Sequence, residues 1–353
     1  MNLTKTDVLI IGAGPAGSAS AAILNKKGYD VTIVEKTQFP RFVIGESLLP
    51  RCMDLLEKAD LLEAVKEKGF QEKSGAIFRN KEKSCDFLFA EQYTEGWKWT
   101  WQVPREDFDS TLADTVEKRG VKILYKTSVE GVNFTDEEVV TTVSSEQGTS
   151  QISSKYIIDG SGYGRVLPRL LDLDKPSSFP SRSAIFTHIE DKKRPKDVNG
   201  SRIQAIVINK ELWAWIIPFS NGKTSVGIVG NIDSLIDSEK TNEENFNQLL
   251  ELDDYLKNRV AGSAYVFEPR KITGYSASVK KFNGDRFVLT GNSTEFLDPI
   301  FSSGVTFALE SGVKAAEMVD KELRGETVDW EKDYVEYIQQ GVDVFRSYVN
   351  NWY

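Results

Sequence analysis

Three glycines near the amino terminus, Gly12, Gly14 and Gly17, stand in the G-x-G-x-x-G spacing directly after a short apolar run. In this spacing the first glycine permits a tight turn, the second lets the backbone approach a pyrophosphate, and the third lets the next helix pack on the strand. Pro15 and Ala16 complete the turn and begin an alanine-rich helix, whose unpaired N–H groups suit phosphate oxygens. These residues indicate dinucleotide binding.

Glu35 ends the next apolar run, residues 31–35, eighteen residues after Gly17, and Lys36 follows it. An acid in this place accepts hydrogen bonds from a ribose diol. A strand, a glycine turn, a helix, a second strand and a terminal acid in this order predict a Rossmann unit. The turn alone does not separate FAD from NAD, but its position at the start of a long chain favours FAD.

A second glycine-containing loop, at Asp159 and Gly160, follows the apolar run 156–158. Its spacing does not match a second dinucleotide turn, and no paired acid follows it. We therefore interpret it as a loop at the end of a sheet strand that closes on the same cofactor. With one Rossmann unit, the sequence indicates no second nicotinamide domain, so reducing equivalents would come from outside, for example from a separate flavin reductase.

The composition is that of an ordinary globular protein, with 353 residues, 40% hydrophobic and 27% charged. The formal charge of −9 argues against a nucleic-acid surface. Two cysteines, Cys52 and Cys85, and one histidine, His188, give little support for disulfides, a metal site or a serine–histidine triad. We interpret His188 as structural. The sequence lacks a signal-peptide pattern and an apolar run of membrane-spanning length, so we expect a cytoplasmic protein.

Alternating apolar and polar residues recur at 98–103, 181–190, 201–209, 212–219 and 223–230. This pattern predicts an antiparallel sheet, with a hairpin at 221–223 and with Trp97, Trp99 and Trp101 on one strand face. An amphipathic helix is expected over 328–353. The predicted fold class is α/β, with a Rossmann-type FAD-binding domain, an interleaved antiparallel-sheet substrate domain and C-terminal helices.

Five motifs extend over most of the chain, from residue 7 to about residue 315. They are GAGPAG at 12–17, FPRFVIGESLLP at 39–50, VPREDFDSTL at 103–112, IIDGSG at 157–162 and GDRFVLTGNSTEFLDPIFSSGVTFALESG at 284–312. Together they resemble the FAD-dependent monooxygenase superfamily, which has the para-hydroxybenzoate hydroxylase fold. Within it, the chain is most similar to the flavin-dependent halogenases and their halogenase-like relatives.

The resemblance implies a discontinuous FAD-binding domain made of residues 1–75, 100–180 and 275–325. The substrate domain would comprise 76–99 and 181–274, and residues 326–353 would form a C-terminal helix. Family members usually continue with further helix that covers the substrate channel. The chain would accordingly be either truncated or a short, open member of the family.

The same resemblance assigns FAD contacts throughout these motifs. They are Arg41, Ser47 and Arg105, the backbone of Val129 at the adenine, Asp159 on the pyrophosphate side, and Gly291, Asn292, Asp298, Pro299, Gly304 and Val305 along the ribityl chain and isoalloxazine. Asn292 departs from the family pattern, because an aspartate is usual there. An amide still hydrogen-bonds hydroxyls and phosphates and removes one negative charge, so we expect FAD binding to survive.

The segment from Pro299 to Gly304 is also typical of a turn before an amphipathic helix. A helix N-terminus aimed at the pyrimidine ring of the flavin would stabilise negative charge on the reduced cofactor. The unpaired N–H groups of Ser303 and Gly304 would also suit a halide ion. A halide is therefore expected beside FAD.

Lys73, in QEKSGAIF, matches the K-x-G-A-x-F pattern of the halogenases. In that family the lysine receives hypohalous acid, made from halide, O₂ and reduced FAD, and passes the halogen to an electron-rich substrate. Burial would lower the pKa of the amine and make it available. The motif WAWIIP at 213–218 matches W-x-W-x-I-P, and Trp213 and Trp215 share a strand face. They would form either a core wall or a partition between flavin and substrate.

Phe301 stands where tryptophan halogenases carry a glutamate before the halide turn, so indole specificity is unsupported. The form PIFSSG favours a small phenolic or pyrrolic substrate, or a carrier-tethered one. Two alternatives share the fold and the FAD motifs: an aromatic hydroxylase, and a saturating reductase of the geranylgeranyl reductase type. Neither needs Lys73 or the tryptophan motif. A flavin-binding protein without turnover is a further alternative.

Overall fold

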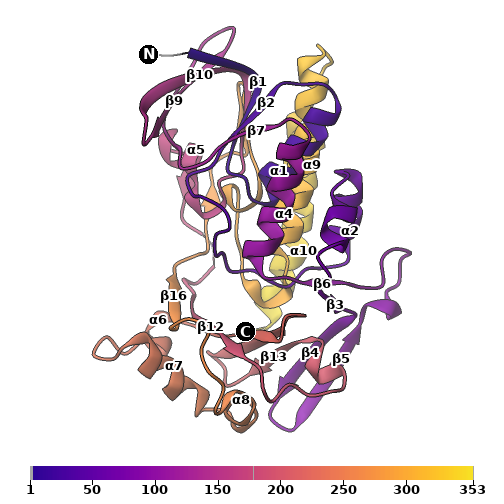
Figure 1. The fold of residues 1–353 in the computed structure, drawn as a ribbon, viewed down its shortest axis with the longest axis vertical. Coiled ribbons are helices and arrows are strands. Elements are labelled where there is room, and N and C mark those ends of the chain that lie inside the picture. Colours follow the sequence, from indigo (N-terminus) through magenta and orange to yellow (C-terminus); the bar gives the residue numbers. More distant parts are fainter. Residues whose placement is uncertain (1–2, 178, 353) are drawn as a thin grey trace.

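The computed structural model describes residues 3–177 and 179–352. Two large sheets occupy opposite ends of the molecule, and long helices stack beside the first of them (Figure 1). The chain passes between the two regions several times, so that segments far apart in the sequence meet where the regions join. The α/β fold class with C-terminal helices is confirmed, and the second sheet is antiparallel except for the parallel pair of β13 with β4.

Within the described residues the first sheet has eight strands in the order β18-β19-β10-β1-β2-β7, with β9 on β10 and β8 on β9. Their bounds are β1 Leu3–Ile11, β2 Val31–Val34, β7 Lys122–Leu124, β8 Ser128–Phe134, β9 Val139–Ser145, β10 Gly148–Asp159, β18 Asn283–Gly284 and β19 Phe287–Leu289. Ile11 pairs with Val34 on one side and with Asp159 on the other. The glycine turn, Glu35 and the Gly160 loop therefore emerge at the same sheet edge.

The second sheet of the described chain has seven strands in the order β16-β12-β15-β14-β13-β4-β5. Their bounds are β4 Gly75–Asn80, β5 Lys83–Leu88, β12 Ser183–Glu190, β13 Ile203–Val207, β14 Trp213–Pro218, β15 Lys223–Gly230 and β16 Arg270–Thr273. Antiparallel pairing of β14 with β15 confirms the hairpin predicted at 221–223. One face of this sheet carries Trp213 and Trp215. This face packs against residues outside the sheet, among them Ile44, Phe296 and Ile300.

Helices connect and cover the sheets. They are α1 Pro15–Lys26, α2 Arg51–Lys58, α3 Leu62–Lys66, α4 Arg105–Lys118, α5 Val166–Leu170, α6 Ile232–Leu235, α7 Asn242–Leu250, α8 Asp254–Val260, α9 Gly304–Leu323 and α10 Tyr337–Trp352. In Figure 1, α1, α4 and α9 lie beside the first sheet, while α6, α7 and α8 lie on the outer side of the second. The described part has no helix long and apolar enough to cross a membrane.

The predicted strand over 98–103 is only partly correct. The strand β6 covers just Thr100–Gln102 and pairs with β3, Gln71–Lys73, rather than with the seven-stranded sheet. Trp97 and Trp99 lie before it, and the rings of Trp97, Trp99 and Trp101 meet edge to face. Tryptophan packing, not strand alternation, therefore explains the apolar pattern of this segment.

The predicted C-terminal amphipathic helix is confirmed as a π-helical stretch, Glu331–Glu336, that continues into α10. Tyr334, Ile338 and Val342 are buried at helical spacing. The hydroxyl of Tyr334 donates to the carbonyl of Leu289 at 2.6 Å, which anchors the helix to the first sheet. The predicted helix extends to Tyr353, which lies outside the described residues.

A close contact between α1 and α9 positions the glycine turn. A Cβ at Gly312 would lie 2.4 Å from the carbonyl oxygen of Ala16, so only glycine fits here. The hydroxyl of Ser20 donates to the carbonyl of Gly312 at 2.8 Å. Because Ala16 belongs to the first turn of α1, this contact sets where the N-terminus of that helix points.

We expect Gly312→Ala to lower the free energy of unfolding by about 1–3 kcal/mol, because the added methyl group overpacks a backbone contact. Gly131→Ala is the matched control, since a Cβ at Gly131 would meet nothing within 4 Å, and its effect should stay within about 0.5 kcal/mol. Urea unfolding measures both. Equal losses in the two variants would contradict the close-contact argument.

Candidate functional site

A cavity of about 540 Å³ lies where the carboxyl edge of the first sheet meets the second sheet. The predicted site residues that line it are Gly12, Gly14, Pro15, Ala16, Glu35, Lys36, Arg41, Ser47, Arg105, Val129, Gly160, Trp213, Trp215, Gly291, Asn292, Pro299, Gly304 and Val305. Five other predicted residues do not line it: Gly17, Lys73, Asp159, Asp298 and Ser303. The structure thus brings together segments separated by nearly three hundred residues.

The glycine turn is shaped by contacts that exclude side chains. Gly12 has a φ of +94°, and a Cβ there would lie 2.7 Å from the carbonyl oxygen of Gly160. A Cβ at Gly17 would lie 1.9 Å from the carbonyl oxygen of Gly12. A Cβ at Gly14 would crowd the guanidinium of Arg41 at 3.3 Å. These glycines leave the N-terminus of α1 open to the cavity, as a phosphate site requires.

Glu35 is buried at the end of β2 and lines the cavity. Its Oε2 accepts from the backbone N–H of Ala13 at 2.9 Å, which ties the acid to the glycine turn. Its Oε1 accepts from the N–H and the hydroxyl of Thr37 at 2.9 and 2.7 Å. These bonds hold the carboxylate at the place where the sequence predicts a ribose contact.

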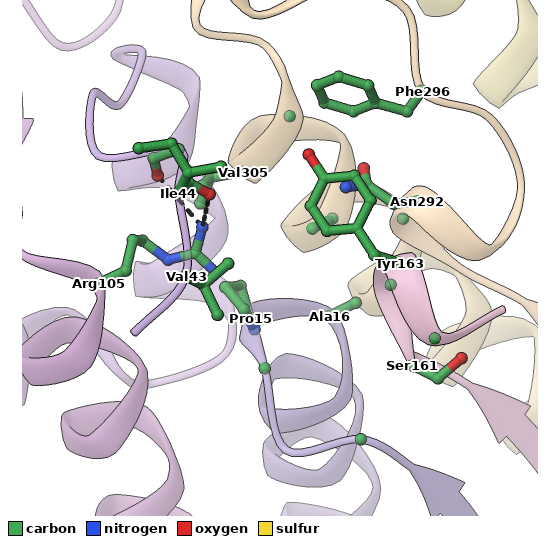
Figure 2. Close-up of a pocket in the computed structure, with 18 of the residues that line it drawn as sticks. Pro15, Ala16, Val43, Ile44, Arg105, Ser161, Tyr163, Asn292, Phe296 and Val305 are labelled. Atoms are coloured by element: carbon green, nitrogen blue, oxygen red, sulfur yellow. Dashed lines mark hydrogen bonds between the residues drawn. The ribbon is translucent and has the colours of Figure 1, made fainter. Parts of the chain in front are cut away.

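Asp109 is a buried carboxylate between the two predicted cofactor arginines. It accepts two bonds from Arg105, at 2.8 and 3.0 Å, and its Oδ2 lies 3.3 Å from Arg41 Nη1. Burial opposes the charge of Arg105, but the pairing with Asp109 raises its pKa. Nη1 of Arg105 donates to the carbonyls of Ile44 and Gly45 at 3.3 and 3.1 Å (Figure 2). Arg105 is thus a permanently charged anchor.

The sequence analysis missed Asp109, although its spacing of four residues from Arg105 on a helix predicts an ion pair. It also missed three aromatic residues of the cavity wall, Tyr163, Tyr275 and Phe296. The Phe296 ring meets those of Tyr163 and Tyr275 at 5.6 Å each. Figure 2 shows Tyr163 and Asn292 together across the cavity from Arg105. Isolated aromatic residues in loops carry no periodic signal.

Asp159 lies behind the cavity wall. Its carboxylate accepts from the N–H of Ser161 at 2.8 Å, the N–H of Leu167 at 2.7 Å and the hydroxyl of Ser293 at 3.0 Å. These three bonds join the Gly160 loop to the 291–293 turn. Its predicted contact with FAD stays a prediction, while the described geometry shows a carboxylate that shapes two cofactor loops.

The N-terminus of α9 faces the cavity at the other end. The carboxylate of Asp298 accepts from the N–H of Ile300 at 3.0 Å, and Ser302 has a φ of +57°. Gly304 then begins a helix of twenty residues. The sequence analysis had named Ser303 and Gly304 for a halide; Gly304 and Ser302 line the cavity, and Ser303 does not. The unpaired N–H groups of this helix can receive negative charge.

Trp213, Trp215 and Ile217 of β14 form the opposite wall. The indole N–H of Trp215 donates to the hydroxyl of Ser225 at 3.0 Å. A Cβ at Gly227, the pairing partner of Trp215, would lie 2.2 Å from its ring, so glycine there makes room for the indole. The predicted tryptophan wall is therefore present and covers the cavity.

Lys73 is fully buried beside the cavity without lining it. Its ammonium nitrogen donates to the hydroxyl of Ser47 at 2.8 Å and to the carbonyl of Leu48 at 2.7 Å, and it lies 5.2 Å from the Phe89 ring centroid. Burial lowers the pKa of Lys73 to about 7. Ser47 does line the cavity, so one hydroxyl connects the cavity to the amine.

The residues present fit FAD. The glycine turn and the α1 N-terminus suit a pyrophosphate, and Glu35 suits a ribose. Arg41 and Arg105 supply cations, and the tryptophan wall with Ile300 suits a flat ring. Among the described residues no cluster of histidine, cysteine or acidic side chains could hold a metal ion.

Comparison with known proteins matches residues 5–338 to the model of the FAD binding domain family. The flavin-dependent halogenase armH3 of Armillaria mellea is 31% identical over 93% of this chain and 69% of its own length. The 1H-pyrrole-2-carbonyl-[peptidyl-carrier protein] chlorinase of Pseudomonas fluorescens is 29% identical over 98% of this chain and 82% of its own length. The crystal structure of a flavoprotein/dehydrogenase from Cytophaga hutchinsonii superposes with a TM-score of 0.95, at 52% identity over 99% of this chain and 86% of that one.

The lowered pKa of Lys73 predicts a pH-dependent stability. Between pH about 7 and 10.5 the unfolded chain binds a proton on this lysine that the folded chain does not. The free energy of unfolding should therefore rise with pH in this window, relative to Lys73→Met, by about 1.4 kcal/mol per pH unit. Urea unfolding from pH about 7.5 to about 9.5 measures the difference, with the exposed Lys83→Met as control. Parallel curves for the native protein and Lys73→Met would contradict the assignment.

Proposed function

The chain belongs to the FAD-binding domain family, in its flavin-dependent halogenase-like branch, and on this premise we propose that it halogenates an electron-rich substrate through Lys73. It is an FAD-dependent oxidoreductase. Reduced FAD supplies the reaction of O₂ with a halide that yields hypohalous acid. The chain's own residues would bind the halide, exclude the organic substrate from the flavin and carry the oxidised halogen to that substrate.

The observation that carries the proposal is the environment of Lys73. At a pKa of about 7, a large fraction of the amine is uncharged near neutral pH and therefore nucleophilic. Its bonds to Ser47 and Leu48 fix it one side chain away from the cavity. A fully buried lysine without a carboxylate partner is rare, so the position of Lys73 supports a functional role beside its structural hydrogen bonds. Lys73 would hold hypohalous acid by a hydrogen bond or as a haloamine.

The N-terminus of α9 supports a halide site. Ser302, in the left-handed region, turns the chain so that the backbone beyond it leads into the first turn of a long helix. Gly304 has no side chain, and a Cβ there would press on the Phe296 ring at 3.2 Å. Open N–H groups at the positive end of a helix favour an anion. Ser303 and Gly304 would be its donors.

The proposed substrate is a phenolic, pyrrolic or carrier-tethered ring. One relative is named a chlorinase of a pyrrole carried on a peptidyl-carrier protein, which supports a tethered substrate here. The ring centroid of Phe301 lies 6.4 Å from that of Phe78 and 6.1 Å from that of Trp352. These aromatic rings make the surface apolar at the position where an acid that directs indole would be needed. Reduced FAD would come from a separate flavin reductase.

The test combines FAD-loaded protein, a flavin reductase, NADH, bromide or chloride, and monochlorodimedone as a trap for hypohalous acid. A phenol added in parallel reports halogen transfer by mass spectrometry. We expect Lys73→Met to lower phenol halogenation about 100-fold or more while flavin reoxidation by O₂ keeps its rate. Lys83→Met controls for the loss of a surface lysine. Hydroxylated phenol from the native protein without a halide requirement would favour the hydroxylase alternative and overturn the proposal.

The tryptophan wall gives a separate prediction. If Trp215 keeps organic molecules away from the flavin, Trp215→Leu should let a small phenol reach it and should yield hydroxylated phenol, which the native protein does not make. Trp99→Leu is the control, because Trp99 is a tryptophan that does not line the cavity. Products are separated by mass. If the Trp215→Leu protein still binds FAD but forms no hydroxylated phenol, the tryptophan wall has a packing role only.

A further inference from the structure

Glu46 is a buried acid in the FAD cavity wall to which the proposed function assigns no role. Its side chain is 1% exposed and lines the cavity beside Ser47. Its Oε1 lies 2.7 Å from Nε2 of His188. Its Oε2 is buried and has no hydrogen-bond partner in the part of the chain that the structure describes. A buried polar oxygen left unpaired is costly unless a proton or a ligand satisfies it.

His188, the single histidine of the chain, holds Glu46 in place. Its ring lies among Phe42, Phe219 and Phe267, with centroid distances of 5.6, 5.2 and 5.0 Å. These rings fix the imidazole so that Nε2 faces the carboxylate. The sequence analysis interpreted His188 as structural, but the structure pairs it with an acid of the cofactor cavity.

The charged groups around this pair come from α4, β3, β16 and the segment from Glu35 to Arg41. Arg105 on α4 bonds to the carbonyl of Gly45, and Lys73 on β3 bonds to Ser47, the two neighbours of Glu46. On the other side, the guanidinium of Arg270 on β16 lies 5.3 and 4.6 Å from the ring centroids of Phe42 and Phe267. Asp109 already pairs with Arg105, and the adjoining Arg41 is shared between Asp109 and Glu35. Glu46 is close enough to Arg105 to help raise the pKa of that guanidinium, but among the described residues the ion pair of Arg105 is with Asp109, not with Glu46.

We propose that Glu46 and His188 form a proton reservoir for the flavin, which takes up one proton when FAD is reduced and returns it to the cavity on reoxidation. Reduction adds negative charge to a buried cavity, where a second negative charge on Glu46 is repelled. Oε2 of Glu46 offers a place for the compensating proton, because none of the described residues donates a hydrogen bond to it. His188 is a positioning residue that keeps Oε1 bound and gives the pair a second site for the proton.

The proton balance of the proposed reaction calls for such a source. One FADH⁻, one O₂, one halide ion and two protons give FAD, hypohalous acid and water. FADH⁻ and the halide each lose two electrons, and O₂ accepts all four. One of its oxygen atoms ends in hypohalous acid and the other in water. The reservoir would supply one of the two protons and would be refilled when reduced FAD next occupies the cavity. The inference rests on FAD binding and does not require halide oxidation.

The test uses FAD-loaded protein, photoreduced without oxygen or halide. Infrared difference spectra should show the C=O stretch of a newly protonated carboxyl group on reduction. A pH indicator in weak buffer should show proton uptake. Glu46→Gln should lose the band and take up about one proton fewer per flavin. Since glutamine keeps the size and a hydrogen bond to His188, the difference reports the proton rather than the packing.

Asp320→Asn is the matched control, because Asp320 is a buried carboxylate that is paired with Lys27 and does not line the cavity; it should keep the band. His188→Gln should shift the frequency of the carboxyl band, since Oε1 of Glu46 loses its imidazole partner. If Glu46→Gln does not bind FAD, this shift tests the reservoir instead. An unchanged band and uptake in Glu46→Gln, an unmoved band in His188→Gln, or no carboxyl band in the native protein overturns the proposal. If the native protein shows the expected carboxyl band but makes no hypohalous acid, the proposed function is contradicted and the proton reservoir is supported.

Discussion

Two buried basic side chains, Arg105 and Lys73, donate hydrogen bonds to residues 44–48, a segment of the cavity wall. Arg105 donates to the carbonyls at the beginning of this segment, and Lys73 donates to the hydroxyl and carbonyl at its end. The segment also bonds through its backbone to β6, and Gln102 of β6 donates to the carbonyl of Pro218 at 2.6 Å. The segment thereby joins the cofactor sheet to the tryptophan wall and places Glu46 and Ser47 between them.

The two cations differ in a way that burial and pairing explain. Arg105 has a carboxylate partner, Asp109, so its charge survives burial. Among the described residues no carboxylate forms an ion pair with Lys73, whose neutral partners cannot offset desolvation, and its pKa falls to about 7. Arg105 therefore keeps a fixed positive charge beside residues 44–48, whereas the charge of the Lys73 amine can vary. A fixed positive charge suits phosphate binding. An amine that can lose its proton suits reversible capture of an electrophile.

The sequence predicted the parts of the fold and site that local backbone geometry determines. The spacing of Gly12, Gly14 and Gly17 encodes a turn that excludes side chains, and alternation located β14 and β15. Pairings made by the tertiary fold were not predictable in this way. Glu46 meets His188 across 142 residues, and nothing in either local pattern marks the contact. Likewise, the left-handed backbone at Ser302 decides which serine lines the cavity, and the tryptophan packing at 97–101 was mistaken for a longer strand.

Strand register limits how the tryptophan wall can act. Trp213 pairs with Val207, which pairs with Asn80, so Trp213 is level with the far end of β4, seven residues from Lys73. Within β4, the rise from Gly75 to Asn80 is about 17 Å at about 3.3 Å per residue, and Lys73 lies before β4, at the end of β3. Trp213 is therefore level with the end of β4 that is farther from Lys73, and the part of β14 nearest the start of β4 is its Pro218 end, which Gln102 holds. Because Ser47 both lines the cavity and bonds to Lys73, its hydroxyl connects the cavity to the amine without passing between the two tryptophans.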